Sequence, residues 1–139
     1  MKLRIIAFVL LAMCLGTGAI ADEVVLITNL ANPDKVIPAR DAKNIFLGKK
    51  STWSDGTPIV SYTLADVAVT EEFARTYVKK SAQQFSNFWR KAIFTGKGTP
   101  PETLSDSEQM KDAIASKKGA IGYILKSKLD SSVTRLQVQ

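Results

Sequence analysis

Strand-like and helix-like patterns alternate along this chain, and the alternation limits the folds that it can adopt. Val24 to Thr28 is a continuous apolar, β-branched run, which is typical of a buried strand. Apolar residues at helical spacing follow from Ala39 to Leu47, and the next apolar run, Ile59 to Leu64, predicts a second strand. Strands interleaved with helices around one core indicate a single three-layer α/β domain with a mostly parallel or mixed sheet, the odd strand being expected at an edge. The remaining expected elements are helices from Thr70, from Ser81 to about Gly96 and from Ser105 to about Lys118, a loop from Gly98 to Leu104, and strands at Ala120 to Leu125 and Val133 to Val138.

Helix starts are marked by polar caps. We expect Thr70 to cap one helix, because a threonine hydroxyl accepts a hydrogen bond from the first helical turn. Ser81 with Gln84, and Ser105 with Glu108, have the spacing of the capping box.

The N-terminal 21 residues have the pattern of a signal peptide. Two basic residues precede an apolar run from Ile5 to Leu15, and Ala19-Ile20-Ala21 is a small-residue site for signal peptidase. The apolar run is too short to span a membrane, which takes about 20 residues. A lipoprotein signal at Cys14 is the rival interpretation, but Met13 stands where a small residue is expected. We therefore expect a mature periplasmic chain of residues 22–139 with no integral membrane segment.

Composition excludes most enzyme mechanisms. The chain has no histidine, and its one cysteine, Cys14, is removed with the signal peptide. Thiolate and imidazole chemistry and Cys/His metal sites are therefore excluded. A hydrolase would need a metal held by aspartates, and no clustered spacing supports one. We predict no enzyme activity, no catalytic residue, no metal and no cofactor.

A formal net charge of +6 raises the possibility of nucleic-acid binding. The lysine pairs 49/50, 79/80 and 117/118, however, all fall at expected helix ends. Lysine there complements the negative end of the helix dipole. We therefore expect no nucleic-acid partner.

Three short stretches of the sequence occur together in a fixed order. Their residues are Ile45-Phe46-Leu47-Gly48-Lys49 running on to Trp53-Ser54-Asp55-Gly56, then Ile93-Phe94-Thr95-Gly96-Lys97-Gly98, then Gly119-Ala120-Ile121-Gly122-Tyr123. In this order they resemble the phosphate-binding proteins of ABC phosphate transporters, and in particular the short, single-lobe relatives of these type II periplasmic binding proteins. The resemblance covers about Val24 to Val138 and implies the fold of one lobe and a periplasmic location.

One segment is a candidate ligand site. A loop between the carboxyl end of a strand and a helix N-terminus is a natural place for an anion, and Thr63 to Thr70 is such a loop. The resemblance implies the same place, because phosphate-binding relatives hold phosphate with a Ser-Gly-Thr-type run shortly before a helical phenylalanine. Counting back from Phe73, the matching positions are Val67, Ala68, Val69 and Thr70.

This chain departs from that pattern. Only Thr70 keeps a hydroxyl, and Ala68 replaces the glycine that lets backbone approach the anion. Glu71 and Glu72 follow directly and would repel phosphate, whereas Arg75 could pair with an oxyanion or with one of these glutamates. The candidate ligand-binding residues are Thr63, Ala68, Val69, Thr70 and Arg75.

Two functions fit the sequence. The first is an exported phosphate-receptor-like domain that binds phosphate or another oxyanion weakly at the Thr63 to Thr70 loop, with two copies of the chain sharing a cleft. The second is a non-catalytic envelope interaction module that keeps the fold, has lost the ligand site and binds another envelope protein. Because fold does not fix function, the sequence leaves both open.

Overall fold

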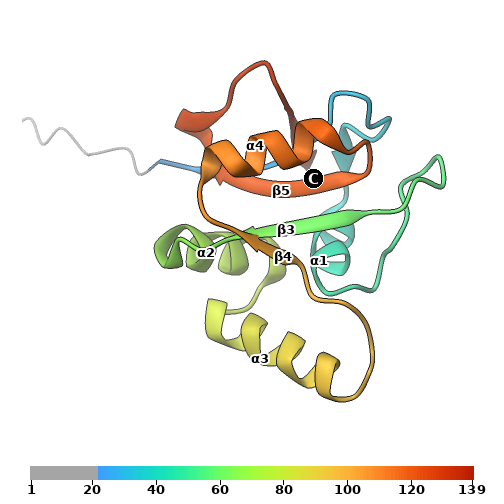
Figure 1. The fold of residues 1–139 in the computed structure, drawn as a ribbon, viewed down its shortest axis with the longest axis vertical. Helices are drawn as coiled ribbons and strands as arrows, with labels where there is room; N and C mark the ends of the chain where they lie inside the picture. Colours follow the sequence, from blue (N-terminus) through green and yellow to red (C-terminus); the bar gives the residue numbers. More distant parts are fainter. Residues whose placement is uncertain (1–21) are drawn as a thin grey trace, which may run out of the picture.

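A computed structural model of the chain describes residues 22–139, so the expected signal peptide and Cys14 lie outside the described residues. The strands are β1 (Val24–Thr28), β2 (Val36–Ile37), β3 (Val60–Leu64), β4 (Glu102–Leu104), β5 (Ala120–Leu125) and β6 (Thr134–Val138). The helices are α1 (Ala39–Phe46), α2 (Val67–Phe73), α3 (Ala82–Phe94) and α4 (Ser107–Ser116), with a π-helical turn η1 (Ala74–Val78) after α2 and a 3₁₀ turn η2 (Lys126–Lys128) after β5. Figure 1 shows α4 lying along β5 and α3 at the end of the molecule beyond β4.

The six strands form one sheet in the order β2-β6-β1-β5-β3-β4. β1 is antiparallel to both of its neighbours, β5 and β6, and the other three pairs are parallel. The predicted α/β domain with a mostly parallel, mixed sheet is therefore confirmed, but the expectation that the odd strand lies at an edge was wrong. β1 is central because all five of its residues are buried, which an edge strand does not allow.

Helices cover both faces of the sheet. Successive residues of a strand point to opposite faces, and in β5 a side chain at Gly122 would meet Met110 of α4. The next residue, Tyr123, instead stacks on Phe73 of α2 at 3.9 Å between ring centroids. Phe73 also contacts Phe46 of α1. The domain thus has three layers, with α4 on one face and α1 and α2 on the other, and its described core side chains all lie between Val24 and Leu136.

The helix caps were predicted partly correctly. The capping box of Ser81 and Gln84 is present with both hydrogen bonds, and α3 begins there as expected. The cap predicted at Thr70 was wrong, because Asp66 caps α2 by accepting a hydrogen bond from the Val69 N–H. An aspartate is at least as good a cap as a threonine, so the earlier residue starts the helix.

The start of α4 is shifted by one residue from the prediction. Asp106, not Ser105, caps the helix and accepts from the Gln109 N–H, while the Gln109 side chain accepts from the Ser105 N–H. The helix ends at Ser116 rather than at about Lys118.

Two short strands were missed by the sequence analysis. β4 lies inside the segment predicted as a loop, after Pro100 and Pro101, and pairs with β3 through Thr63 and Thr103. β2 has only two residues and pairs with β6. Strands of two or three residues show no measurable period-2 pattern, so sequence periodicity cannot reveal them.

A buried lysine ties α4 to the segment before β6. Lys111 is only 6% exposed, and its Nζ lies 2.7 Å from Oδ2 of Asp130 and 3.0 Å from Oε1 of Glu108. Hydrogen bonds to Asp130 and then Glu108 raise the pKa of Lys111. Hydrogen bonds from Lys111 and then Ser132 hold the pKa of Asp130 well below its ordinary value of 3.8.

We expect Asp130→Asn to lower the Tm by several degrees at neutral pH, because it leaves a buried ammonium without its closest counter-charge. A depressed carboxyl pKa stabilises the folded state above its ordinary value of 3.8, and this contribution is lost as the pH falls through the folded-state pKa. A raised lysine pKa stabilises the folded state below the ordinary value of 10.5, and this contribution is lost as the pH rises through the folded-state pKa. Thermal unfolding of both proteins should therefore show a constant difference between about pH 4 and pH 10 that shrinks in acid. Glu108→Gln, at a side chain 76% exposed, is the control; a Tm difference that does not change with pH would contradict the assignment.

Candidate functional site

The candidate loop follows β3 and includes the first turn of α2. Oδ1 of Asp66 accepts a hydrogen bond of 3.1 Å from the Val69 N–H. The carboxylate therefore lies at the helix N-terminus, where the free N–H groups and the dipole would otherwise attract an anion. Ala68 is exposed and Val69 is half-buried, and neither side chain has a polar atom to offer a ligand.

Thr70 lies in the second turn of α2, and its hydroxyl is engaged inside the protein. Its Oγ1 donates to the Leu64 carbonyl oxygen at 2.8 Å and lies 2.6 Å from the Tyr123 hydroxyl. Because Thr70 gives its proton to Leu64, Tyr123 donates to Thr70, and the Leu64 N–H in turn donates to the Tyr123 oxygen at 2.9 Å. Burial raises the pKa of Tyr123, so the phenol stays protonated as this network requires. The network joins β3, α2 and β5.

Arg75 is held away from the loop. Its Nε lies 2.5 Å from Oε1 of Glu71, which is the surface pair that the sequence allowed. Oε2 of Glu71 accepts from the Ala82 N–H at 2.8 Å, and this bond, followed by the one from Arg75, lowers the pKa of Glu71. Arg75 borders a separate hollow with Lys79 and Lys80, distinct from the one that Thr63 and Thr70 line.

Thr63 and Thr70 do come together, at one hollow between α3 and strands β3 and β4. This α3–β4 hollow has a volume of about 380 Å³. Its polar lining consists of hydroxyl groups and one guanidinium: Thr63, Thr70, Ser86, Thr103 and Arg90. Thr63 and Thr103 are hydrogen-bonded through their hydroxyl oxygens at 3.1 Å. Such a lining can hydrogen-bond a small oxyanion and pair with its charge.

The sequence analysis missed Ser86, Arg90 and Thr103 as lining residues. Ser86 and Arg90 are spaced i and i+4 on α3, beside the buried Phe85 and Trp89. That spacing places the two polar residues on one helix face, so it was a usable signal. Thr103 could not be placed, because its strand was not predicted.

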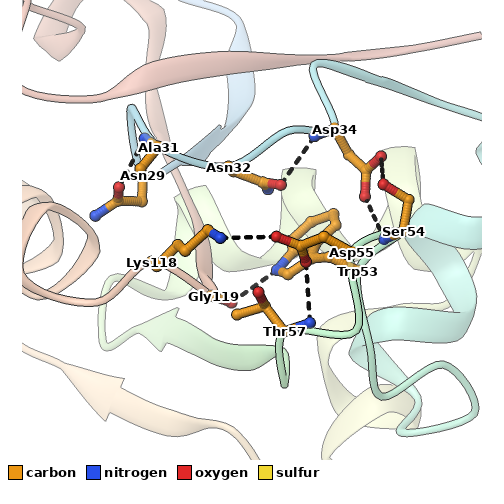
Figure 2. Close-up of polar contacts among 10 residues, drawn as sticks. All are labelled: Asn29, Ala31, Asn32, Asp34, Trp53, Ser54, Asp55, Thr57, Lys118 and Gly119. Carbon is orange, nitrogen blue, oxygen red and sulfur yellow. Dashed lines mark hydrogen bonds and ion pairs between the residues drawn. The ribbon is translucent and has the colours of Figure 1, made fainter.

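The motif around Trp53 has a structural role at the opposite end of β3. Trp53 is 2% exposed, and its Nε1 donates to the Gly119 carbonyl oxygen at 3.0 Å. Next to it, Lys118 Nζ lies 2.7 Å from Oδ2 of Asp55 (Figure 2). The hydrogen bond from Lys118, then those from Thr57, hold the pKa of Asp55 well below its ordinary value. The turn thus fixes the entry to β3 against the entry to β5.

A second set of contacts lies beside this turn. Asp34 accepts from the Ser54 N–H at 2.8 Å and from the Ser54 hydroxyl at 2.6 Å (Figure 2). Asn32 is 1% exposed and its Oδ1 accepts from the Asp34 N–H. These bonds tie the loop after β1 to the Trp53 turn.

Two glycines of the recognised stretches also serve packing. Gly48 has φ +72°, and a Cβ there would lie 2.8 Å from the Trp89 ring. Trp89 donates through Nε1 to the Phe46 carbonyl oxygen at 3.0 Å, so this contact joins α1 to α3. A Cβ at Gly122 would lie 2.3 Å from the Met110 sulfur, which brings α4 close to β5. These two glycines therefore serve the packing of helices and not a ligand.

Within residues 22–139, no group of three or more His, Cys, Asp and Glu side chains is placed to hold a metal ion. None of the helices in the same range combines the length and the apolar character needed to cross a bilayer.

Comparison with known proteins agrees with the architecture. No protein-family model matches the sequence, and no curated protein matches it. Among solved structures, a protein from Clostridium perfringens, assigned as a phosphate ABC transporter substrate-binding protein and solved with bound phosphate, matches with a TM-score of 0.66 and 26% identity over 84% of this chain and 45% of that one. An ABC-type phosphate transport receptor from Vibrio cholerae matches with a TM-score of 0.58 and 18% identity over 84% of this chain and 46% of that one.

A third match is PstS from Borrelia burgdorferi, with a TM-score of 0.57 and 12% identity over 85% of this chain and 47% of that one. The chain thus spans less than half the length of the proteins that it matches. These structural matches lead to one conclusion: this chain has the fold of one lobe of the substrate-binding proteins of phosphate ABC transporters.

Proposed function

We propose that this chain is a non-catalytic, phosphate-receptor-like lobe that acts as an interaction module of the cell envelope and not as a high-affinity phosphate receptor. The position of the Asp66 carboxylate carries this proposal. It caps α2 through the Val69 N–H and so puts a negative charge where a receptor of this fold would need to accept an anion.

The energetic argument is electrostatic. Two unit charges of the same sign 4 Å apart repel by about 1 kcal/mol in water and about 4 kcal/mol near a protein surface of effective dielectric constant 20. The smaller value is about a quarter, and the larger value about the whole, of the roughly 4 kcal/mol that corresponds to a millimolar Kd. An anion at a single lobe also stays in contact with water, so each of its hydrogen bonds contributes less than it would between two lobes.

Weak oxyanion binding is the second candidate function, and two observations favour it. The structural relative from Clostridium perfringens has bound phosphate. The α3–β4 hollow next to the candidate loop offers Arg90 and hydroxyl groups that include Thr63 and Thr70. On this alternative the anion would bind in the α3–β4 hollow and not at the capped N-terminus of α2.

Export to the periplasm is part of the proposal. It is supported by the signal-peptide pattern of residues 1–21 and by the likeness to transporter receptors. A partner in the cell envelope would then bind on its surface.

Calorimetric titration of residues 22–139 with phosphate tests the proposal. We expect no saturable heat in the millimolar range, because Asp66 repels the anion and the hydroxyl of Thr70 is engaged with Leu64 and Tyr123. Light scattering on the same sample gives its mass and so detects a dimer.

Saturable phosphate binding that survives moderate salt would overturn the interaction-module proposal in favour of the oxyanion candidate. Arg90→Gln would then be the informative variant, because Arg90 borders the hollow and makes no contact with the Thr70 network. Lys128→Gln, at an exposed position in η2, is its charge-matched control.

A further inference from the structure

Two apolar pairs lie at the ends of helices, and one of them is buried whereas the other is exposed. Ile45 and Phe46 at the end of α1 are 3% and 0% exposed. Ile93 and Phe94 at the end of α3 are 55% and 93% exposed, although each pair is followed by a glycine with positive φ. Burying a phenylalanine side chain removes apolar surface from water and is favourable, so Ile93 and Phe94 leave available a contact of the kind that Ile45 and Phe46 make within the domain.

Positive charge surrounds the exposed pair. The segment 81–101 contains three basic residues and no acidic one. Lys91 and Lys97 border a hollow of about 400 Å³ together with Lys49 from the end of α1, and no carboxylate lines it. In the described part of the chain, none of these three lysines takes part in an ion pair.

We name this surface the α3 tip, made of Lys49, Arg90, Lys91, Ile93, Phe94 and Lys97. Most of it lies on α3, which is at the end of the molecule beyond β4, and the chain turns back toward the sheet after this helix (Figure 1). Arg90 and Lys91 border the hollow that Ile93 and Phe94 line, so cations flank the apolar pair directly.

We propose that the α3 tip docks on an anionic lipid bilayer, with Phe94 and Ile93 entering the headgroup region and the four cations facing lipid phosphates. Charge complementarity favours an anionic bilayer as the partner, because every charged side chain of the α3 tip is basic and an anionic leaflet presents only negative net charge. This is peripheral binding at a surface and needs no membrane-spanning helix.

The size and shape of the α3 tip favour a bilayer over a protein partner. A specific protein interface buries roughly 1,000 Å² or more around a well-packed apolar centre. The α3 tip has only two apolar side chains, and Phe94 stands out from the surface at 93% exposure. A bilayer needs no complementary pocket, because each cation near an anionic surface adds to the attraction and the ring adds apolar burial to it.

The inference rests on the proposed function, since it names the surface through which the interaction module acts. Separate experiments test the proposed function and the docking inference. Phosphate binding measured by calorimetry would overturn the module proposal, whereas the docking inference is decided by lipid vesicles.

Vesicle co-sedimentation of residues 22–139 tests the docking. The segment 1–21 is omitted because its apolar run would itself insert into lipid, and the described core lies wholly outside it. We expect binding to phosphatidylglycerol-containing vesicles, at least tenfold weaker binding to pure phosphatidylcholine vesicles, and loss of most binding at high salt. Phe94→Ser and the double variant Lys91→Glu/Lys97→Glu should each weaken binding at least tenfold.

Matched control variants make the same kinds of change outside the α3 tip. Leu30→Ser removes an apolar side chain that is 57% exposed elsewhere, and Lys79→Glu/Lys80→Glu makes the same change of charge at another helix end. Both should bind vesicles like the unchanged protein, and thermal unfolding verifies that every variant is folded. Millimolar free phosphate should not displace the protein, because a single ion cannot replace the bilayer that the apolar pair enters.

Three results would overturn the docking inference. The first is the absence of binding to anionic vesicles. The second is equal loss in control and α3-tip variants, which would indicate non-specific attraction by net charge. The third is retention on immobilised polyglutamate without vesicle binding, which would assign the surface to an acidic protein partner.

Discussion

Replacing Phe73 by alanine is expected to lower the free energy of unfolding by about 3 to 5 kcal/mol. The ring is fully buried at the junction of three helices and the sheet. It stacks on Tyr123 with ring centroids 3.9 Å apart and meets Phe46 edge-on at 4.6 Å and Phe85 at 6.0 Å. Its removal leaves a cavity that rigid neighbouring rings cannot fill, and each lost aromatic pair adds about 0.5 to 1.5 kcal/mol.

Urea unfolding followed by tryptophan fluorescence measures this loss. Phe94→Ala is the matched control, because the same atoms are removed from a side chain that is 93% exposed. It should stay within about 0.5 kcal/mol of the unchanged protein. If the two variants lost equal stability, Phe73 would not be the centre of the core.

Gly119→Ala should be the second most damaging change, at about 3 kcal/mol. A Cβ at this position would lie 1.9 Å from the carbonyl oxygen of Pro58, a backbone atom that no rotamer change can move. The backbone must shift, and the shift disturbs the hydrogen bond from Trp53 Nε1 to the Gly119 carbonyl oxygen. Both the unfolding midpoint and the environment of the buried tryptophan should change.

Gly56→Ala separates this clash from backbone strain. Gly56 has φ +84°, but a Cβ there would meet nothing within 4 Å. Its substitution should cost only the 1 to 2 kcal/mol or so of a left-handed alanine. If Gly119→Ala lowered the free energy of unfolding no more than Gly56→Ala, the Pro58 segment would be able to move aside.

Sequence periodicity identified those elements whose signal is local. The strand Val24–Thr28 was predicted at its observed bounds because a short apolar, β-branched run ended by a turn is typical of a buried strand, and all five residues are indeed buried. The capping box at Ser81 was identified because both partners lie within one turn. β2 and β4 escaped, since a strand of two or three residues is defined by its partner across the sheet and not by its own sequence.

The candidate site was less accessible for a related reason. Resemblance directed attention to Thr70, but whether that hydroxyl is free depends on Tyr123, which comes 53 positions later in the chain. The capping role of Asp66 was open to local reasoning, since an aspartate three residues before a helical N–H is a standard N-cap. Arg90 and Thr103 share a hollow only because α3 folds back beside β4.

The central position of β1 has a consequence for how the chain is made. β1 is synthesised first among the strands, yet both of its neighbours, β5 and β6, follow roughly a hundred residues later. A nascent chain therefore has no partner for this fully buried strand until α4 and the strands after it have been made, and closing so long a loop slows folding. We therefore expect the sheet to form only after nearly the whole chain has been made, because β1 and its two partners complete it together.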